Sequence, residues 1–400
     1  MTALPAGLRS IHPPLLVAYG FRPFFLLAGL AGFGLVAGWL VILAQGGWPP
    51  GPIAPAAWHA HEMLFAFTTA AIAGFLLTAV PSWTGTAARH GWPLGGLVGL
   101  WLAGRLVLLP GAGVAPALAA VVDLTFLPAL AAALAGPLVR AGKARNTAFV
   151  GLLAVLTGAN LLFHLDWLGV MDGGVAAGER LAIGTVLMMV AVVGGRIVPN
   201  FTRNALTSHG ITAPVVSVPW LERVTLGTTL ALLPLDLLLP ESPVTGLVAL
   251  AAGVAHALRL ARWQGRHTLD QPIVWILHAA YAWIPIGLVL KAMALLDGGI
   301  AISAATHALT AGAFSAMILA VMTRATLGHT GRRLVVGRPV VASYGLLLLA
   351  AAFRVSAALF PGLMEPLLHG AGAAWLGAFG LYLWVYGPML VTPRQDGRPG

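Results

Sequence analysis

The sequence predicts an all-α polytopic membrane protein, and three observations support this fold class. Hydrophobic residues make up 59% of the 400 positions and charged residues only 8%, whereas about a quarter of the residues in soluble domains are charged. Long apolar runs recur along the chain, each close to the ~20 residues that a helix needs to cross a membrane. Basic residues gather in alternate loops between these runs. Together these features predict about twelve transmembrane helices in a single domain over residues 1–400.

The predicted spans are separated by short breaks that contain polar residues, proline or glycine. They cover residues 18–44, 58–82, 92–110, 114–140, 146–170, 178–199, 217–240, 243–262, 271–296, 299–326, 338–360 and 367–392. The break over residues 110–116 is very short, so spans three and four are the least distinct pair.

The loops predict an orientation for these spans. Loops after even-numbered spans are basic, with Arg89 after span two, Arg203 after span six and Arg332 after span ten. Loops after odd-numbered spans carry few basic residues and contain acids such as Asp172 and Glu365. Because basic loops tend to stay in the cytoplasm, both termini are expected there. The formal net charge of +10 therefore reflects orientation in a lipid bilayer, and no nucleic-acid partner is expected.

Three similar segments predict an internal repeat. "VPSWTGTAARHG", "VPNFTRNALTSHG" and "VMTRATLGHTG" end spans two, six and ten, and their threonines Thr84, Thr202 and Thr323 are 118 and 121 residues apart. A period of this length is typical of repeated structural units. The sequence thus predicts three pseudo-equivalent four-helix units over residues 18–140, 146–262 and 271–392.

Histidines in the outer halves of the spans are the first candidate site. His59 and His61 open span two in "WHAHEM", His164 lies in span five, and His307 lies in span ten. Imidazole is the commonest metal ligand and a natural axial ligand of haem iron. Residues two apart on a helix point about 200° apart, so His59 and His61 serve different centres unless the helix starts after His59. Glu62 is expected to orient a histidine or carry protons.

Further ionisable residues inside the spans complete the candidate set, because such groups are expensive in a membrane and usually functional. Arg105, Arg180 and Arg354 lie in outer portions of spans and suit haem propionates. His256 and His278 lie nearer the cytoplasm, where metal binding, proton relay and interhelical hydrogen bonding all remain open. The chain has no cysteine, so any metal is expected on histidine, carboxylate, methionine or a prosthetic group.

Four separated motifs together resemble the NnrS family of polytopic bacterial membrane proteins. They are "YGFRPFFLLAGL", "WHAHEMLFAF…AIAGFLLTAVPSWTG", "GGRIVPNFTRN" and "HALTAGAFSAMILAVMTRATLGHTGR", in the expected order from about Gly20 onward. The resemblance implies a twelve-helix protein of the bacterial inner membrane that contains haem and copper and is tied to denitrification and nitric-oxide defence. It places the histidines of the family at His59, His61 and His307. Ala66 departs from the family pattern, in which glycine is common.

The predicted architecture also resembles the catalytic subunit of haem–copper oxidases and nitric-oxide reductases. That subunit has twelve spans in three four-helix repeats, with haem-binding histidines on spans two and ten. Span six of this chain, residues 178–199, contains no histidine, although the oxidase subunit places a copper ligand there. The departure argues against an oxidase-type binuclear centre, since fold analogy alone does not establish chemistry.

Three functions remain open from the sequence. The first is a redox protein of nitric-oxide metabolism, with haem on His61 and His307, copper on His59 and His164, protons from Glu62 and electrons from quinol or a cytochrome. If it is an enzyme, it is an oxidoreductase acting on nitric oxide. The second is a transporter for a metal or small anion, and the third is a sensor or scavenger that binds nitric oxide without turnover.

Overall fold

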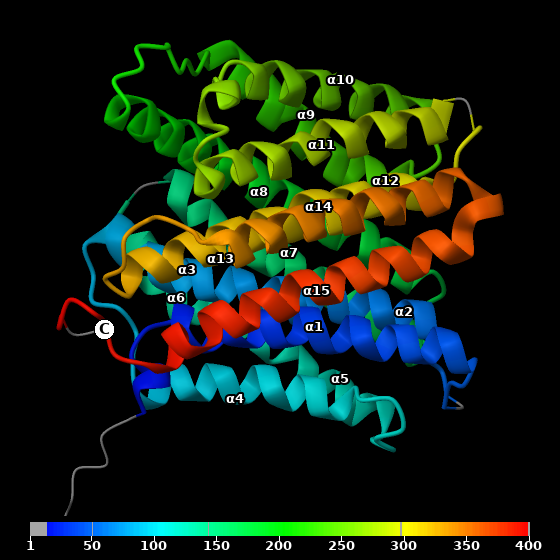
Figure 1. Cartoon of the computed structure of the whole chain (residues 1–400). Coiled ribbons are helices and arrows are strands. Elements are labelled where there is room, and N and C mark those ends of the chain that lie inside the picture. The colour runs from blue at the N-terminus through cyan, green and yellow to red at the C-terminus, as the bar shows by residue number, and fades with distance from the viewer. Residues whose placement is uncertain (1–13, 50, 143, 297, 399–400) are drawn as a thin grey trace, which may run out of the picture.

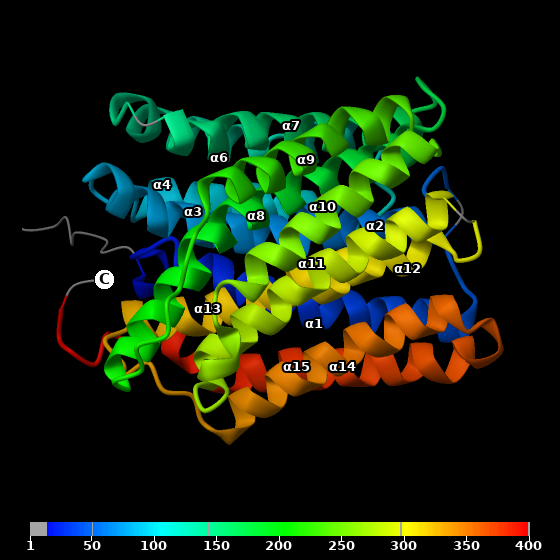
Figure 2. The same ribbon diagram turned by 90° about the horizontal axis from the view of Figure 1, so that it is seen from above.

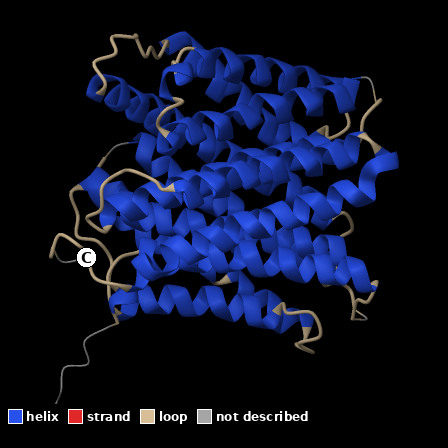
Figure 3. Ribbon diagram, viewed as in Figure 1, coloured by secondary structure: helices blue, strands red, loops and turns tan. Residues whose placement is uncertain are grey.

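The computed structural model describes residues 14–49, 51–142, 144–296 and 298–398. Over these residues the chain is a bundle of helices without a β-strand (Figure 3). Ten of the described helices are long and apolar enough to cross a membrane. The predicted fold class, an all-α polytopic membrane protein, is therefore confirmed. Predictions that concern residues 1–13 and 399–400, including the extreme termini, lie outside the described residues.

Each of the twelve predicted spans coincides with a helical segment. In chain order the elements are η1 (Leu15–Val17), α1 (Phe21–Gln45), α2 (Pro55–His61), η2 (Glu62–Thr68), α3 (Thr69–Thr84), α4 (Trp92–Val107), α5 (Pro116–Leu124), α6 (Phe126–Arg140), α7 (Ala144–Trp167), α8 (Gly174–Ser208), α9 (Pro219–Leu238), α10 (Pro243–Ala261), η3 (Gly265–Thr268), α11 (Pro272–Leu296), α12 (Ile302–His307), η4 (Ala308–Phe314), α13 (Ser315–His329), α14 (Arg338–Leu359), η5 (Pro361–Leu363) and α15 (Met364–Val391). Spans two, four and ten are each built from consecutive shorter helices.

The count of twelve is approximate, because two of the segments differ from the other ten. Helix α4 is apolar but has only 16 residues. Helix α9 has 20 residues but carries Glu222, Arg223 and Asp236. Two of these charges pair with neighbouring helices: Glu222 with Arg259 of α10, and Asp236 with Lys291 of α11. Pairing between helices removes much of the cost of placing these charges at membrane depth.

The helices run back and forth along one direction (Figures 1 and 2). We call the end where α2 and α12 begin the histidine end, and the end where η1 and the last turns of α15 lie the terminal end. Helix α1 packs on α3 and α15, α7 on α8, α10 on α11, and α14 on α15. Large apolar side chains such as Leu238, Leu247 and Trp384 remain exposed on the outside. Apolar surface of this extent is typical of a membrane-facing bundle.

Two π-helices interrupt the helices that carry the candidate histidines. Helix η2 directly follows His61, and η4 directly follows His307. The Thr68 hydroxyl at the end of η2 donates to the Met63 carbonyl oxygen five residues earlier (2.8 Å), and Ser315 closes η4 in the same way. The wider turn changes which way the preceding histidines face relative to the helix that follows. Such π-turns are rare and occur frequently at functional sites.

Candidate functional site

His59 and His61 face different sites, as their two-residue spacing predicts. Helix α2 begins at Pro55, before both histidines, so the alternative that the helix starts after His59 is wrong. His59 lines a cavity at the histidine end of the bundle. His61 is fully buried and lies beside Asp123 of α5 and His164 of α7. One helix therefore serves two sites, which we call the His59 pocket and the Asp123 cluster.

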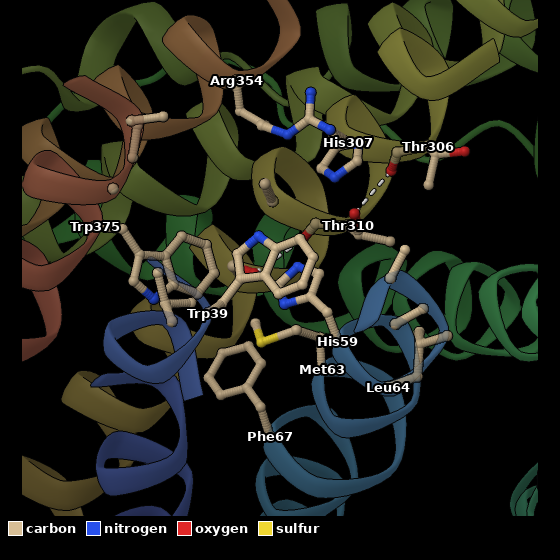
Figure 4. Close-up of a pocket in the computed structure, with 18 of the residues that line it drawn as sticks. Trp39, His59, Met63, Leu64, Phe67, Thr306, His307, Thr310, Arg354 and Trp375 are labelled. Atoms are coloured by element: carbon tan, nitrogen blue, oxygen red, sulfur yellow. Dashed lines mark hydrogen bonds between the residues drawn. The ribbon is translucent and has the colours of Figure 1, made fainter. Parts of the chain in front are cut away.

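The His59 pocket is a cavity of about 430 Å³ lined by residues of α1, α2, η2, α8, α12, η4, α13, α14 and α15. Its walls are mostly apolar and include the rings of Trp39, Phe67 and Trp375 (Figure 4). The ionisable side chains that line it are those of His59, Glu179, His307 and Arg354. A concave, aromatic cavity with a few converging polar groups is the usual form of a site for a cofactor or small molecule.

The ring of His59 is held by stacking on the indole of Trp39. The ring centroids are 4.6 Å apart and the planes differ by 17°. Its Nδ1 is buried and has no hydrogen-bond partner among the described residues. Leaving such a group unpaired costs about 1–3 kcal/mol. A rigid imidazole at a cavity wall, with a nitrogen left unpaired, is suited to hold a bound group.

The ring of His307 is oriented by the backbone of its own helix. Its Nδ1 lies 2.8 Å from the Ser303 carbonyl oxygen, so Nδ1 donates and the lone pair is on Nε2. The ring points into the cavity, opposite His59 (Figure 4). Arg354 of α14 lies beside it and donates from Nη2 to the Ser303 hydroxyl (3.3 Å). The His59 pocket thus combines an available imidazole nitrogen with an adjacent guanidinium.

The Asp123 cluster is a group of polar side chains packed between α2, η2, α4, α5 and α7. Its members are His61, Glu62, Arg105, Asp123, Asn160 and His164. All are buried except Arg105, whose side chain is 12% exposed. A polar network at this depth is stable only when its groups satisfy one another.

Asp123 is the centre of this cluster. Its Oδ2 lies 3.0 Å from His164 Nε2 and 3.3 Å from His61 Nε2, and it accepts a hydrogen bond from Asn160 Nδ2 at 2.8 Å. The three ligand atoms of His61, Asp123 and His164 lie within 4.8 Å of one another. Metal–ligand bonds of about 2.0–2.2 Å bring the donor atoms of one ion this close together. The three side chains can therefore hold one metal ion.

Arg105 and Glu62 complete the cluster. Arg105 donates from Nη1 to Glu62 Oε1 (2.8 Å) and from Nη2 to Asp123 Oδ1. Glu62 Oε1 also lies 2.9 Å from His61 Nδ1. One guanidinium faces two carboxylates, which leaves one negative charge when both imidazoles are neutral. Because an uncompensated buried charge is expensive, the cluster favours either a proton on a histidine or a bound cation.

The remaining predicted residues belong to neither site. His256 bonds through Nε2 to the Thr229 hydroxyl (3.0 Å) and through Nδ1 to the Tyr281 hydroxyl (2.7 Å). His278 bonds through Nε2 to the Thr202 hydroxyl (2.7 Å). Both rings therefore make interhelical hydrogen bonds, one of the alternatives that the sequence left open.

The predicted arginines lie in three different places. Arg354 lines the His59 pocket, whereas Arg105 is held by the two carboxylates of the Asp123 cluster. Arg180 lies next to Glu179 on α8 but is not among the residues lining the pocket, and its Nε is buried without a described hydrogen-bond partner. Of the three predicted arginines, only Arg354 lies where it could contact a group bound in the pocket.

The structure combines the predicted histidines in a different way from the sequence analysis. We expected His61 with His307 and His59 with His164. Instead His59 and His307 line one cavity, while His61 and His164 share Asp123. The spacing of His59 and His61 predicts two directions but does not say which histidine faces which neighbour, because that depends on the rotation of α2 in the bundle.

Three residues of the two sites were not predicted from the sequence: Asp123, Asn160 and Glu179. Asp123 lies within the predicted span 114–140, and an acidic residue inside a span is itself a functional indication. Asn160 is four residues before His164 and so shares its helix face. Glu179 begins the apolar part of span six. Each was detectable as a polar residue at membrane depth, but none belongs to a recognisable motif.

Comparison with known proteins places this architecture in a family. No curated protein matches the chain at a significant level. The family model described as NnrS protein matches residues 15–394, a range that includes every residue of the His59 pocket and the Asp123 cluster. Since this match covers nearly all of the 400 residues, the chain belongs to the NnrS family.

Proposed function

We propose that this chain is a haem- and copper-binding protein of nitric-oxide metabolism, with haem in the His59 pocket and copper in the Asp123 cluster. Family membership fits a membrane protein related to nitric oxide. The observation that carries the proposal is the cavity lined by His59 and His307 from separate helices, with Arg354 beside them. His59, His307 and Arg354 are far apart in the sequence, and the fold brings them together at one cavity.

The side chains that line the His59 pocket suit haem in their chemistry. The Nε2 lone pair of His307 and the stacked ring of His59 would hold the iron, and Arg354 would pair with a propionate. Haem, when bound, supplies an iron that changes oxidation state and binds diatomic gases. Trp39, Phe67 and Trp375 line the cavity and would provide apolar surface for the faces of the macrocycle.

The Asp123 cluster fits a copper ion. Two imidazoles and a carboxylate form a donor set that copper accepts. Glu62 accepts from His61 Nδ1, and His61 Nε2 faces Asn160 Oδ1 and Asp123 Oδ2, so a bound ion would take the place of the proton on Nε2. A carboxylate behind a ligating histidine, fixing its tautomer in this way, is a common arrangement at metal sites. A bound cation would also compensate the excess negative charge of the cluster.

Protons for a reductive reaction are proposed to pass through Glu179. Glu62, the proton carrier expected from the sequence, is held by Arg105 and His61, and it does not line the pocket. Glu179 is the sole carboxylate among the described residues that do. A carboxyl group at the cavity wall is within reach of a bound substrate. Electrons would come from quinol or a cytochrome.

The proposal is tested by the absorption spectrum and metal content of the purified protein, before and after addition of nitric oxide. The expected result is a haem band that shifts with nitric oxide, together with bound copper. His59→Ala and His307→Ala should each lose haem, whereas His61→Ala and His164→Ala should lose copper and keep haem. A protein with neither cofactor, or haem retained in both pocket variants, would contradict the proposal.

Binding of nitric oxide without turnover is the second candidate. It is favoured by the pocket having a single described carboxylate, Glu179, to supply protons. Consumption of nitric oxide by the pure protein with a quinol donor distinguishes the two. Turnover that falls in Glu179→Gln, with nitric-oxide binding unchanged, would support reduction, and binding without consumption would support a sensor or scavenger.

A further inference from the structure

A second, smaller cavity lies next to the His59 pocket, on the side of the terminal end. Its volume is about 80 Å³, and it is lined by α1, α3, α7, α8 and α13 together with Thr68 and Phe314. Every lining residue except Thr68 is apolar or glycine. The Thr68 hydroxyl is already bonded to the Met63 carbonyl oxygen. We call this space the Thr68 cavity.

Water is poorly suited to the Thr68 cavity. A buried water typically makes about three hydrogen bonds to polar groups, and the lining offers no free donor or acceptor. The cavity is nevertheless several times larger than the roughly 10–15 Å³ that one water requires. Enclosed apolar cavities stay dry and take up small apolar molecules such as xenon, and the apolar lining of this space favours the same kind of occupant. The occupant that fits is therefore uncharged, apolar and small.

The Thr68 cavity lies directly beside the His59 pocket. Thr68 lines both spaces. On α8, Ile183 lines the pocket, and Val186, one turn further on, lines the cavity. On α13, Ser315 lines the pocket and Ile318 lines the cavity. The helices η2, α8 and α13 thus border both spaces, and Thr68, the last residue of the π-helix that follows His61, lies between them.

We propose that the Thr68 cavity binds a neutral diatomic gas and delivers it to the His59 pocket. The site excludes nitrite, metal ions and other charged species, because nothing in its lining replaces their hydration. The identity of the gas as nitric oxide rests on the proposed function, whereas the cavity and its apolar selectivity do not. Gas from the bilayer would collect here next to the pocket.

Xenon is the probe that tests the cavity independently of haem. Crystals of the whole protein under xenon pressure should show an anomalous peak in the space between α3, α8 and α13. Val190 lines the cavity, and Val192 is on the same helix, half-buried, but does not line it. Val190→Phe should abolish the xenon peak, and the matched Val192→Phe should retain it. Ile72→Phe fills the cavity from α3 and serves as a second variant if Val190→Phe does not fold.

The kinetic test is the rate at which nitric oxide reaches the haem. Val190→Phe should slow association about tenfold, equivalent to about 1.4 kcal/mol of added barrier, and Val192→Phe should leave it unchanged. A wild-type cavity without xenon, a peak retained in Val190→Phe, or density for an acyl chain in this space would overturn the inference. Xenon binding in a protein without haem would refute the proposed function alone. Nitric-oxide binding without a xenon site would refute this inference alone.

Discussion

The neighbours of individual residues make the two histidines of α2 chemically different. His61 Nδ1 lies 2.9 Å from Glu62 Oε1, whereas His59 Nδ1 has no described hydrogen-bond partner and its ring is fixed by stacking on Trp39. A carboxylate partner fixes the tautomer and raises the basicity of a ligand. An aromatic partner fixes only the orientation. Under the proposed function, the same kind of side chain would bind a cation in one site and a planar cofactor in the other.

Replacing Glu62 should weaken copper binding and leave haem unchanged. In Glu62→Gln the amide no longer accepts as an anion from His61 Nδ1, and a loss of about 10–100-fold in metal affinity is expected for such a partner. Glu62 does not line the His59 pocket, so the haem band should remain. Copper affinity from competition with a chelator and the absorption spectrum are the two measurements.

Glu179→Gln is the matched control for that substitution. It makes the same chemical change at the wall of the His59 pocket and does not contact the Asp123 cluster, so copper affinity should stay at the wild-type value. Equal copper affinity in Glu62→Gln and the wild-type protein would show that Glu62 does not act on His61 in the way we infer.

At the scale of helices, the contact between the start of α1 and the end of α15 closes the bundle. Arg22 is fully buried and donates from Nη1 to the carbonyl oxygens of Leu390 and Thr392, both at 2.9 Å. The last carbonyls of a helix lack partners within the helix and carry the negative end of its dipole. One guanidinium satisfies both and links the two ends of the described chain.

Replacing this cap should destabilise the protein. Arg22→Met removes hydrogen bonds of a charged donor to the carbonyl oxygens of Met389, Leu390 and Thr392, each worth about 1.5–3 kcal/mol, and takes this partner away from the end of α15. Arg203→Met is the control, since Arg203 is exposed and its one hydrogen bond among the described residues is to Asn200, three residues away. The melting temperature measured in detergent should fall for Arg22→Met and stay at the wild-type value for Arg203→Met. Equal melting temperatures of the two variants would contradict the capping role.

The helices themselves were predictable, because membrane thickness and apolar length determine them. Spans such as 18–44, 243–262 and 271–296 coincide with α1, α10 and α11 to within a few residues. The π-helices were not predictable: "EMLFAFT" has no sequence feature that distinguishes it from an α-helical segment. They affect how the histidines face the bundle, so the pairing of His59 with His307 could be found only from the structure.

The predicted repeat stays a prediction, and the hydrogen bonds of its three threonines differ. Thr202 and Thr323 each lie six residues before the end of their helix, in α8 and α13. Thr202 bonds to His278 of α11 and Thr323 to Tyr344 of α14, both at 2.7 Å. Thr84 departs from this pattern because it is the last residue of α3 and bonds to Thr86.

At the scale of the whole molecule, the arrangement of charge predicts a single orientation in the membrane. Basic residues are concentrated at the terminal end, including Arg89 and Arg332 in loops and Arg203 near the end of α8. A green fluorescent protein fused to the C-terminus should therefore fluoresce in the cytoplasm. Alkaline phosphatase inserted between α4 and α5 should be active on the outer side, and the same enzyme inserted between α8 and α9 should be inactive. The opposite result would show that the topology is inverted and that both sites lie toward the cytoplasm.

Removing copper should leave haem in place, because the two sites share a helix but no side chain. His61, Asp123 and His164 have side-chain exposures of 0%, 3% and 2%, so a chelator reaches the ion only when the bundle opens locally. Copper loss should therefore be slow and should accelerate as detergent or urea promotes opening. The haem band, followed in the same sample, should stay constant over that time course.

His164→Ala is the control for copper removal. This protein should be free of copper from the start and should show the wild-type haem spectrum, since His164 does not line the His59 pocket. Loss of haem and copper together, in the variant or during chelation, would mean that one centre uses ligands from both sides of α2. Such a result is incompatible with His59 and His61 pointing about 200° apart on a continuous helix, and it would require α2 to unwind when the metals bind.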